Sequence, residues 1–193
     1  MAEVAIKLMS VEEFLAWDDG TDARYELIQG RPVAMAPPVR RHALLSARLI
    51  GRLAAALNGR QGCNVFTEAG IRSTASRRTF FVADIAVSCA DTPDSSQGLD
   101  HPILIVEVLS PSTEATDRRR KLHDYRLLPT VQEIVLIDPA EMFCEVHRRV
   151  ADIWRTDLLR GAEARLVLES VGLDLPLGEL YAGIPLDDAA QAG

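Results

Sequence analysis

The sequence has few of the residues that mark secreted, zinc-binding or membrane proteins. Its three cysteines, Cys63, Cys89 and Cys144, are scattered and form no Cys-x-x-Cys pair, so we expect buried thiols in a reducing cytoplasm rather than a disulfide or a zinc site. No apolar run approaches the roughly 20 residues that span a bilayer. The N-terminus lacks the charged start and long apolar stretch of a signal peptide. These absences predict a cytoplasmic protein without a membrane segment.

Aromatic residues are also scarce, at 5% of the chain, so aliphatic side chains must fill most of the core. With 193 residues and 48% hydrophobic content, the chain can bury a sizeable core. We expect a single domain over residues 1–186, followed by a flexible tail at 187–193.

Positive charge is outweighed overall but is unevenly distributed. The net charge is −7, yet the segment 40–78 contains eight arginines and only one acid. Such arginines can form a solvated helix face, or they can bind phosphates on an otherwise acidic protein. For the second case, the candidate nucleic-acid-binding residues are Arg41, Arg48 and Arg52 of this segment and Arg118 of a second basic cluster at 118–126.

Turn and capping signals divide the chain into short helices and strands. Ser10 and Glu13 have the spacing of a capping box and predict a helix over about 10–17. Gln29-Gly30 predicts a hairpin between the runs 24–28 and 31–35. Apolar residues at helical spacing predict a helix over about 40–58, and a second helix is expected to begin near Thr116 and Asp117. Further strands are expected at 65–71, 80–87, 103–109, 133–137, 143–147, 152–157 and 164–168.

Two of these strands are apolar runs that each contain one carboxylate. Asp84 interrupts the run 80–87, and Glu107 interrupts the run 103–109. Apolar runs without polar alternation are typical of central strands that are covered on both faces. A buried carboxylate must be paired, hydrogen-bonded or bound to a cation. The two acids are therefore candidate ligands of a metal ion.

Four other residues allow both a structural and a functional interpretation. Glu26 is either a solvent-facing strand residue or part of the site. His42 is either a packed core or cap residue or a catalytic one. Lys121 and Tyr125 share one helix face with Leu128, so Lys121 either extends to solvent from an apolar stripe or points into the site. Tyr125 is expected to pack or to orient a neighbour rather than to react.

The order of motifs along the chain resembles the Uma family, a branch of the PD-(D/E)XK nuclease superfamily. The segments that carry the resemblance, over roughly residues 9–184, are Tyr-Glu-Leu-Ile-Gln-Gly at 25–30, Met-Ala-Pro-Pro at 35–38, His42, Ala-Asp-Ile-Ala-Val at 83–87, Val-Glu-Val-Leu-Ser-Pro-Ser-Thr at 106–113, Lys-Leu-x-x-Tyr at 121–125 and Leu-Ile-Asp-Pro at 136–139.

The resemblance implies an α/β (α+β) fold, with a mixed central β-sheet flanked by helices as in restriction endonucleases. It implies that Asp84 and Glu107 bind Mg²⁺, with Mn²⁺ as a substitute, that Lys121 assists the reaction, and that Glu26 completes the site. Two positions depart from the superfamily pattern: Ala83 replaces its proline, and Leu109 stands where its lysine is expected. Lys121 matches the position to which the Uma family moves that lysine.

The function implied is hydrolysis of DNA phosphodiester bonds, by a protein expected to be a homodimer. Three alternatives stay open: an inactive nuclease fold that only binds nucleic acid, a structural or oligomerisation module whose acids pair with arginines, and a different metal-dependent hydrolase.

Overall fold

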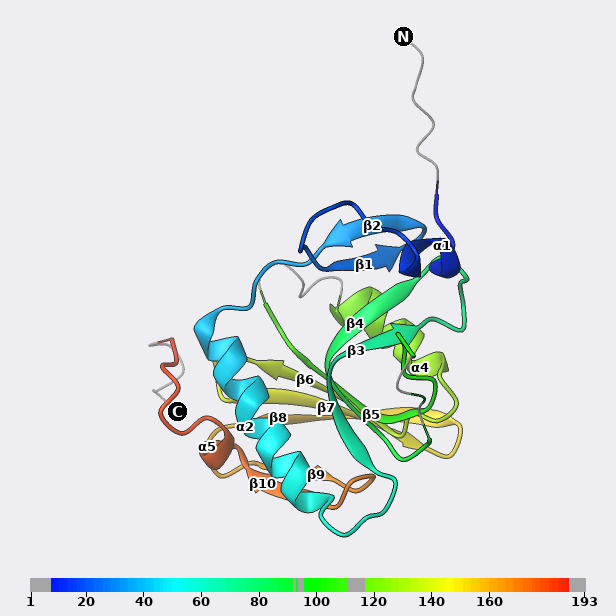
Figure 1. Cartoon of the computed structure of the whole chain (residues 1–193). Coiled ribbons are helices and arrows are strands. Elements are labelled where there is room, and N and C mark those ends of the chain that lie inside the picture. Colours follow the sequence, from blue (N-terminus) through cyan, green and yellow to red (C-terminus); the bar gives the residue numbers. More distant parts are fainter. Residues whose placement is uncertain (1–7, 92, 94–95, 111–116, 188–193) are drawn as a thin grey trace.

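The computed structural model describes residues 8–91, 93, 96–110 and 117–187, which form a mixed α+β fold around one twisted sheet (Figure 1). The sheet has eight strands in the order β2-β1-β4-β5-β6-β7-β8, with β3 paired to β4 off this path. Its strands are β1 (Tyr25–Ile28), β2 (Arg31–Ala34), β3 (Asn64–Arg72), β4 (Phe80–Ser88), β5 (Pro102–Val108), β6 (Glu133–Asp138), β7 (Phe143–Val150) and β8 (Ile153–Arg160). Among the strands described, only β5 and β6 pair in parallel, so the mixed central sheet is confirmed.

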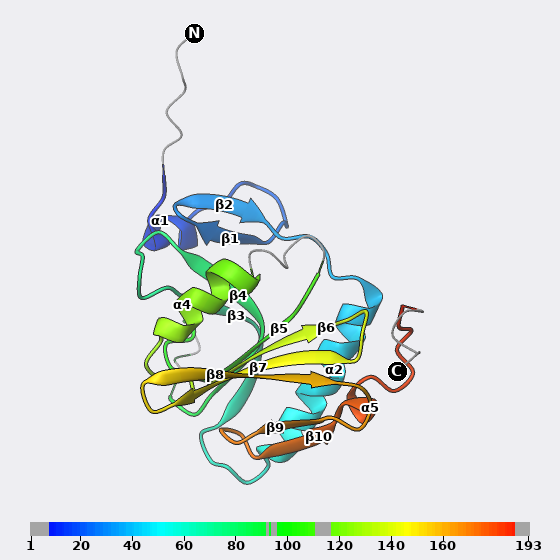
Figure 2. The ribbon, with the colours of Figure 1, turned by 180° about the vertical axis from the view of Figure 1, so that it is seen from behind.

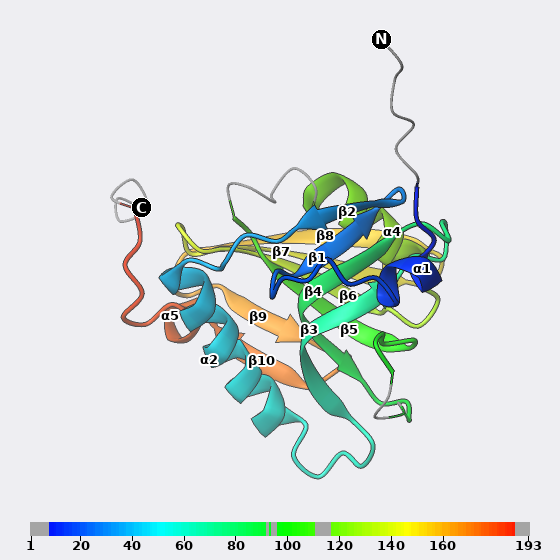
Figure 3. The ribbon, with the colours of Figure 1, turned by 45° about the horizontal axis from the view of Figure 1, so that its top comes forward.

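Helices cover both faces of this sheet. The long helix α2 (Arg40–Ala56) and the helical turn formed by η1 (Asp117–Lys121) and α4 (Leu122–Leu127) lie on opposite sides, as Figures 1 and 2 both show. The leucine stripe of α2 is fully buried in one core cluster, whereas Tyr125 of α4 belongs to the other. The two-stranded sheet of β9 (Arg165–Leu168) and β10 (Leu173–Pro176) and the short helix α5 (Leu177–Leu180) complete the α2 side (Figure 3).

The predicted local signals are present at the N-terminal end. Ser10 and Glu13 form the expected capping box at the start of α1 (Val11–Leu15). The hairpin turn between β1 and β2 has positive φ angles at both Gln29 and Gly30, as its geometry requires. A Cβ atom on Gly30 would lie 2.9 Å from the Cβ of Leu8, so close packing excludes a side chain there.

Other expectations differ from the structure or fall outside it. The helix expected near Thr116 and Asp117 begins, within the described residues, as the π-helical turn η1, and Thr116 lies outside them. Of the proposed tail, residues 188–193 also lie outside the described part. Within that part, no helix has the length and apolar character needed to cross a bilayer.

The expectation of free thiols is wrong for two of the three cysteines. Cys63 and Cys89 form a disulfide, while Cys144 is a buried free thiol. The reason lies in the β3–β4 pairing, which joins Asn64 to Ser88. The next position outward on each strand is a cysteine, so the hairpin register brings the two residues together although 26 positions separate them in sequence.

The alternation of side chains along β4 reverses at Asp84. Phe81 and Ala83 pack in the core cluster that contains Tyr125, whereas Ile85 and Val87 pack in the cluster under α2. Since residues two apart on a regular strand face the same way, the pleat must invert between Ala83 and Ile85. The β3–β4 ladder is interrupted at the same point, and Glu68, the β3 residue there, has a φ of 50°. The irregularity thus coincides with a candidate site residue.

One buried histidine of β7 gives a stability prediction. His147 contacts the Nη2 of Arg126 at 3.0 Å and the Oγ1 of Thr156 at 2.7 Å through its Nδ1 atom. Burial and the positive charges of Arg126 and Arg118 lower the pKa of His147 to about 4. Between the ordinary histidine pKa of about 6.5 and a pH of about 4, this histidine is therefore protonated in the unfolded chain but neutral in the folded protein.

We expect this difference to remove stability progressively as the pH falls from about 6.5 to about 4, with a slope approaching about 1.4 kcal/mol per pH unit. His147→Asn should show a shallower pH dependence of its unfolding free energy, measured by urea denaturation. The matched control is His123→Asn, because His123 is exposed. Equal slopes for wild type and His147→Asn would refute the assignment.

Candidate active site

The candidate site lies in a fork of the sheet on one edge of β4. Strand β1 pairs with β4 only at Leu27 and Phe80, and the pairing between β5 and β4 starts at Ile85. The backbone of β4 between these points has no strand partner on this edge. Its polar groups must be satisfied by side chains, because unpaired buried backbone groups are costly.

Glu26 and Lys121 satisfy the backbone of Val82 in this fork. The amide of Val82 donates to Glu26 Oε1 at 2.8 Å, and the carbonyl of Val82 accepts from Lys121 Nζ at 3.2 Å. Lys121 Nζ also lies 2.9 Å from Glu26 Oε1. Glu26 is therefore buried beside the other candidate residues, and the solvent-facing alternative does not apply to it.

Lys121 is the centre of a cluster of buried acids. Its side chain is only 4% exposed, and its ammonium lies 3.3 Å from both Glu107 Oε1 and Asp117 Oδ1 in addition to the contact with Glu26. Burial alone would lower the pKa of Lys121, but the charges of the three carboxylates outweigh it and raise the pKa. Lys121 is therefore a permanent cation, and it points into the site rather than to solvent.

Glu107 is held by its neighbours through a single oxygen. The hydroxyl of Tyr125 donates to Glu107 Oε1 at 2.7 Å, so Tyr125 orients this acid as expected. Burial raises the pKa of Glu107 well above its usual range; Lys121 opposes the shift, and the charges of Asp84 and Asp117 add to it. Burial also raises the pKa of Tyr125, and the Glu107 charge adds to the effect, so its hydroxyl stays protonated and can donate.

Asp84 lies beside Glu107 on the neighbouring strand. The β4–β5 pairing starts at Ile85 and Val106, so Asp84 and Glu107 each lie one residue beyond its end, where the charge of Asp84 acts on Glu107. Asp84 Oδ2 accepts from the amide of Val108 at 2.7 Å and lies 3.2 Å from His42 Nε2. Burial lowers the pKa of His42, but the hydrogen bond to Asp84 and its charge outweigh this, so the pKa stands above its ordinary value. His42 thus contacts a site residue instead of serving only as core.

The donor set fits a hard divalent cation. In the described residues, the contacts of Glu107 use Oε1 and those of Asp84 use Oδ2, which leaves one oxygen of each acid for a metal. Mg²⁺ prefers carboxylate oxygens and retains several waters, so two such ligands suffice. In the described part of the chain, no group of three or more His, Cys, Asp or Glu side chains is arranged to hold a metal ion. Three of the acids surround the ammonium of Lys121 instead.

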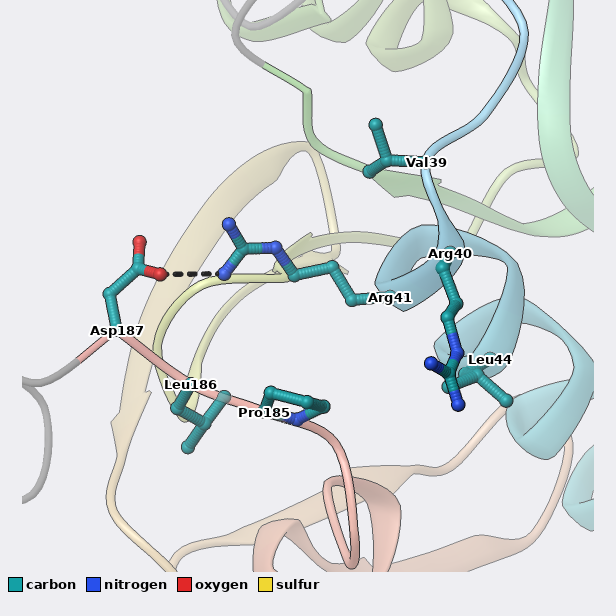
Figure 4. A pocket seen from close by; sticks show the side chains of 7 residues that line it. All are labelled: Val39, Arg40, Arg41, Leu44, Pro185, Leu186 and Asp187. Atoms are coloured by element: carbon teal, nitrogen blue, oxygen red, sulfur yellow. Dashed lines mark hydrogen bonds and ion pairs between the residues drawn. The ribbon is translucent and has the colours of Figure 1, made fainter.

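The four candidate DNA-binding arginines make contacts within the protein. Arg48 donates to the carbonyls of Leu180 and Ala182 at 2.7 Å, and Arg52 pairs with Glu179 at 2.9 Å. Arg41 pairs with Asp187 at 2.8 Å, beside a cavity of about 370 Å³ at the start of α2 (Figure 4). Arg118 pairs with Glu145. The contacts of Arg41, Arg48 and Arg52 tie α2 to the C-terminal segment, and a role of the four arginines in DNA binding stays a prediction.

Sequence reasoning missed one acid of the cluster. Asp117 was expected as a helix cap, whereas the structure buries it against Lys121, four positions later on η1. The acid-to-lysine spacing of four was the available signal, because residues at i and i+4 on one helix face are neighbours.

Comparisons with known proteins identify relatives of this chain. Residues 11–178 match the family Uma2, described as "Putative restriction endonuclease". Two uncharacterized proteins of Synechocystis sp. are similar to this chain. The protein slr1290 is 30% identical over 91% of this chain and 93% of its own length. The protein sll1609 is 28% identical over 86% of this chain and 96% of its own length.

A solved structure shares the fold. The crystal structure of a "putative nuclease belonging to DUF820" from Anabaena variabilis superposes with a TM-score of 0.74 at 21% identity, over 90% of this chain and 98% of that one. Because the family match covers most of the chain, including Glu26, Asp84, Glu107 and Lys121, the chain belongs to the Uma2 family.

Proposed function

We propose that this protein is a metal-dependent endonuclease that hydrolyses phosphodiester bonds of DNA. The observation that carries the proposal is the pair of acids on neighbouring strands, Asp84 and Glu107, each with one oxygen left for a cation. The description of the Uma2 family supports DNA as the substrate.

The charge balance of the site supports a bound cation. Glu26, Glu107 and Asp117 surround a single ammonium, and Asp84 adds a further acid next to them. Burying uncompensated negative charge is unfavourable, and the raised pKa of Glu107 reflects that cost. Mg²⁺ or Mn²⁺, when bound by these carboxylates, polarises a phosphate and makes a bound water more acidic.

The remaining residues have roles that follow from their contacts. Lys121 is a buried cation within reach of Glu107, so it can stabilise negative charge that develops on a phosphate held beside the acids, or orient the attacking water. Glu26 holds Lys121 in place through its 2.9 Å ion pair and is also available as a further ligand or base. Tyr125 fixes the orientation of Glu107 through its 2.7 Å hydrogen bond.

The contacts in the fork also favour a second interpretation, a structural role for the same residues. Glu26, Lys121 and Asp84 satisfy backbone groups of Val82 and Val108 that the diverging strands leave unpaired. A protein that had lost its chemistry would keep these contacts for stability alone and would not need a metal ion.

Cleavage and metal binding separate the two interpretations. Purified protein should cut supercoiled plasmid or single-stranded DNA in Mg²⁺ or Mn²⁺ and leave both intact in EDTA, and calorimetric titration should detect binding of Mg²⁺. Absence of cutting and of metal binding in a folded protein would contradict the proposal. If such a protein still bound DNA in a gel-shift assay, a function in DNA binding alone would replace the proposed nuclease function.

A further inference from the structure

The eight-stranded sheet has three free edges among the described residues, and they differ in how well they could pair with another strand. Strand β2 is four residues long and contains Pro32, which lacks the N–H group that a ladder requires. Strand β3 is broken by the irregular residue Glu68. Natural sheets use short strands, proline and bulges in this way to prevent edge-to-edge association.

The edge at β8 carries none of these protective features. The strand has eight residues, none of them proline or glycine, and pairs with β7 along its whole length. No backbone group elsewhere in the described part of the chain bonds to its outer edge. Ile153 and Leu158 on this strand, at 68% and 66% exposure, are the most exposed large hydrophobic side chains described.

The sequence of β8 is complementary to itself when two copies run antiparallel around Thr156. Side chains that face each other across antiparallel strands contact directly, and opposite charges or apolar pairs there are stabilising. In the register centred on Thr156 the facing pairs are Arg155 with Asp157, Trp154 with Leu158, and Ile153 with Leu159.

Exposure and charge are consistent with this pairing. The side chain of Arg155 is 60% exposed, so it can extend across the edge. Asp157 already accepts from Arg148 and from Arg155 of its own chain. A carboxylate has two oxygens and several acceptor positions, so an arginine of a second copy can share it.

We propose that two copies of this chain associate through their β8 strands, paired antiparallel around a two-fold axis at Thr156, into one continuous sheet. The partner is a second copy because the edge matches its own sequence in charge and in apolar character. Closed two-fold association satisfies the exposed edge on both copies at once. The proposal is independent of the enzymatic function, since β8 carries no residue of the candidate site.

Solution mass and substitutions on the edge test the proposal. Wild-type protein at about 50 µM should sediment as a dimer, and Leu158→Lys should raise the dimer dissociation constant at least about tenfold, because charge on an edge opposes pairing. The matched control is Val33→Lys on the opposite edge strand β2, where an exposed valine is replaced in the same way. Circular dichroism would verify that both variants are folded.

A cysteine placed on the axis tests the register. Facing Cα atoms of antiparallel strands lie about 4.5–5.5 Å apart, within the range that a disulfide can bridge. Thr156→Cys should therefore form a disulfide-linked dimer on mild oxidation, and Arg155→Cys should not, because its two copies are offset by two residues. The native cysteines do not compete, since Cys144 is buried and the others are bonded to each other.

The outcomes are decisive in both directions. A monomeric wild type, or a dimer that Leu158→Lys leaves intact, would overturn the proposal. Disulfide cross-linking that is as fast in Arg155→Cys as in Thr156→Cys would overturn the register. Capture of a different protein in place of a second copy would also count against the proposal.

Discussion

Replacing Asp84 with asparagine is expected to reduce metal-dependent DNA cleavage by about a thousandfold or more, because the amide is a poor ligand for a hard cation. The fold should survive this change. Asp84 Oδ2 accepts the amide of Val108, and the side-chain carbonyl of asparagine can accept the same hydrogen bond. Asp84→Ala would remove the acceptor and leave the Val108 amide unpaired, at a cost of about 1–3 kcal/mol in unfolding free energy. Asp84→Asn therefore tests the role of Asp84 in cleavage with less effect on stability than Asp84→Ala.

The measurement is the initial rate of plasmid nicking in Mg²⁺, together with the urea midpoint of each variant. Asp152→Asn is the matched control, since the same chemical change is made at an exposed turn residue. Wild-type cleavage by Asp84→Asn would remove Asp84 from the chemistry. A variant that is inactive because it is unfolded would instead support the structural interpretation of the fork.

Replacing Lys121 with methionine is expected to destabilise the protein by about 3–5 kcal/mol at neutral pH, because it leaves several buried carboxylates without their cation. Methionine keeps the length of the side chain, so the effect isolates the charge. The loss should shrink as the pH falls, since uncompensated carboxylates in the folded variant have raised pKa values and take up protons more readily than those of the unfolded chain.

Urea unfolding at pH 7 and pH 5 measures both parts of this prediction. Arg120→Met is the matched control, because it removes one positive charge from an exposed position next to Lys121. If Lys121→Met had the same unfolding free energy as Arg120→Met at pH 7, the acids around Lys121 would have to be neutral. The argument that their negative charge favours a bound cation would then fail.

The parts of the site that could be predicted from the sequence are those set by local patterns. Asp84 and Glu107 stand out because each interrupts an apolar run, and the central strands β4 and β5 are buried as those runs require. The shared face of Lys121 and Tyr125 follows from helical spacing, and both side chains are buried in the structure.

The parts that could not be predicted depend on contacts between distant segments. Glu26 meets Lys121 only because β1 leaves β4 after a single residue pair, which no local pattern encodes. Three arginines of α2 were expected to face solvent or DNA, but the partners of Arg41, Arg48 and Arg52 come from α5 and the segment after it, more than 100 residues away. The Cys63–Cys89 disulfide likewise depends on the register of the β3–β4 hairpin, which strand propensities do not fix.

The fork in the sheet connects the site to the backbone of β4 at the amide of Val82. This amide donates a hydrogen bond to Glu26, the residue that also holds Lys121. A ligand that draws Glu26 away leaves this amide without its acceptor, whereas a ligand that leaves Glu26 in place does not disturb it. The exchange rate of the Val82 amide proton with deuterated solvent therefore reports, without any added label, whether a bound ligand draws Glu26 away.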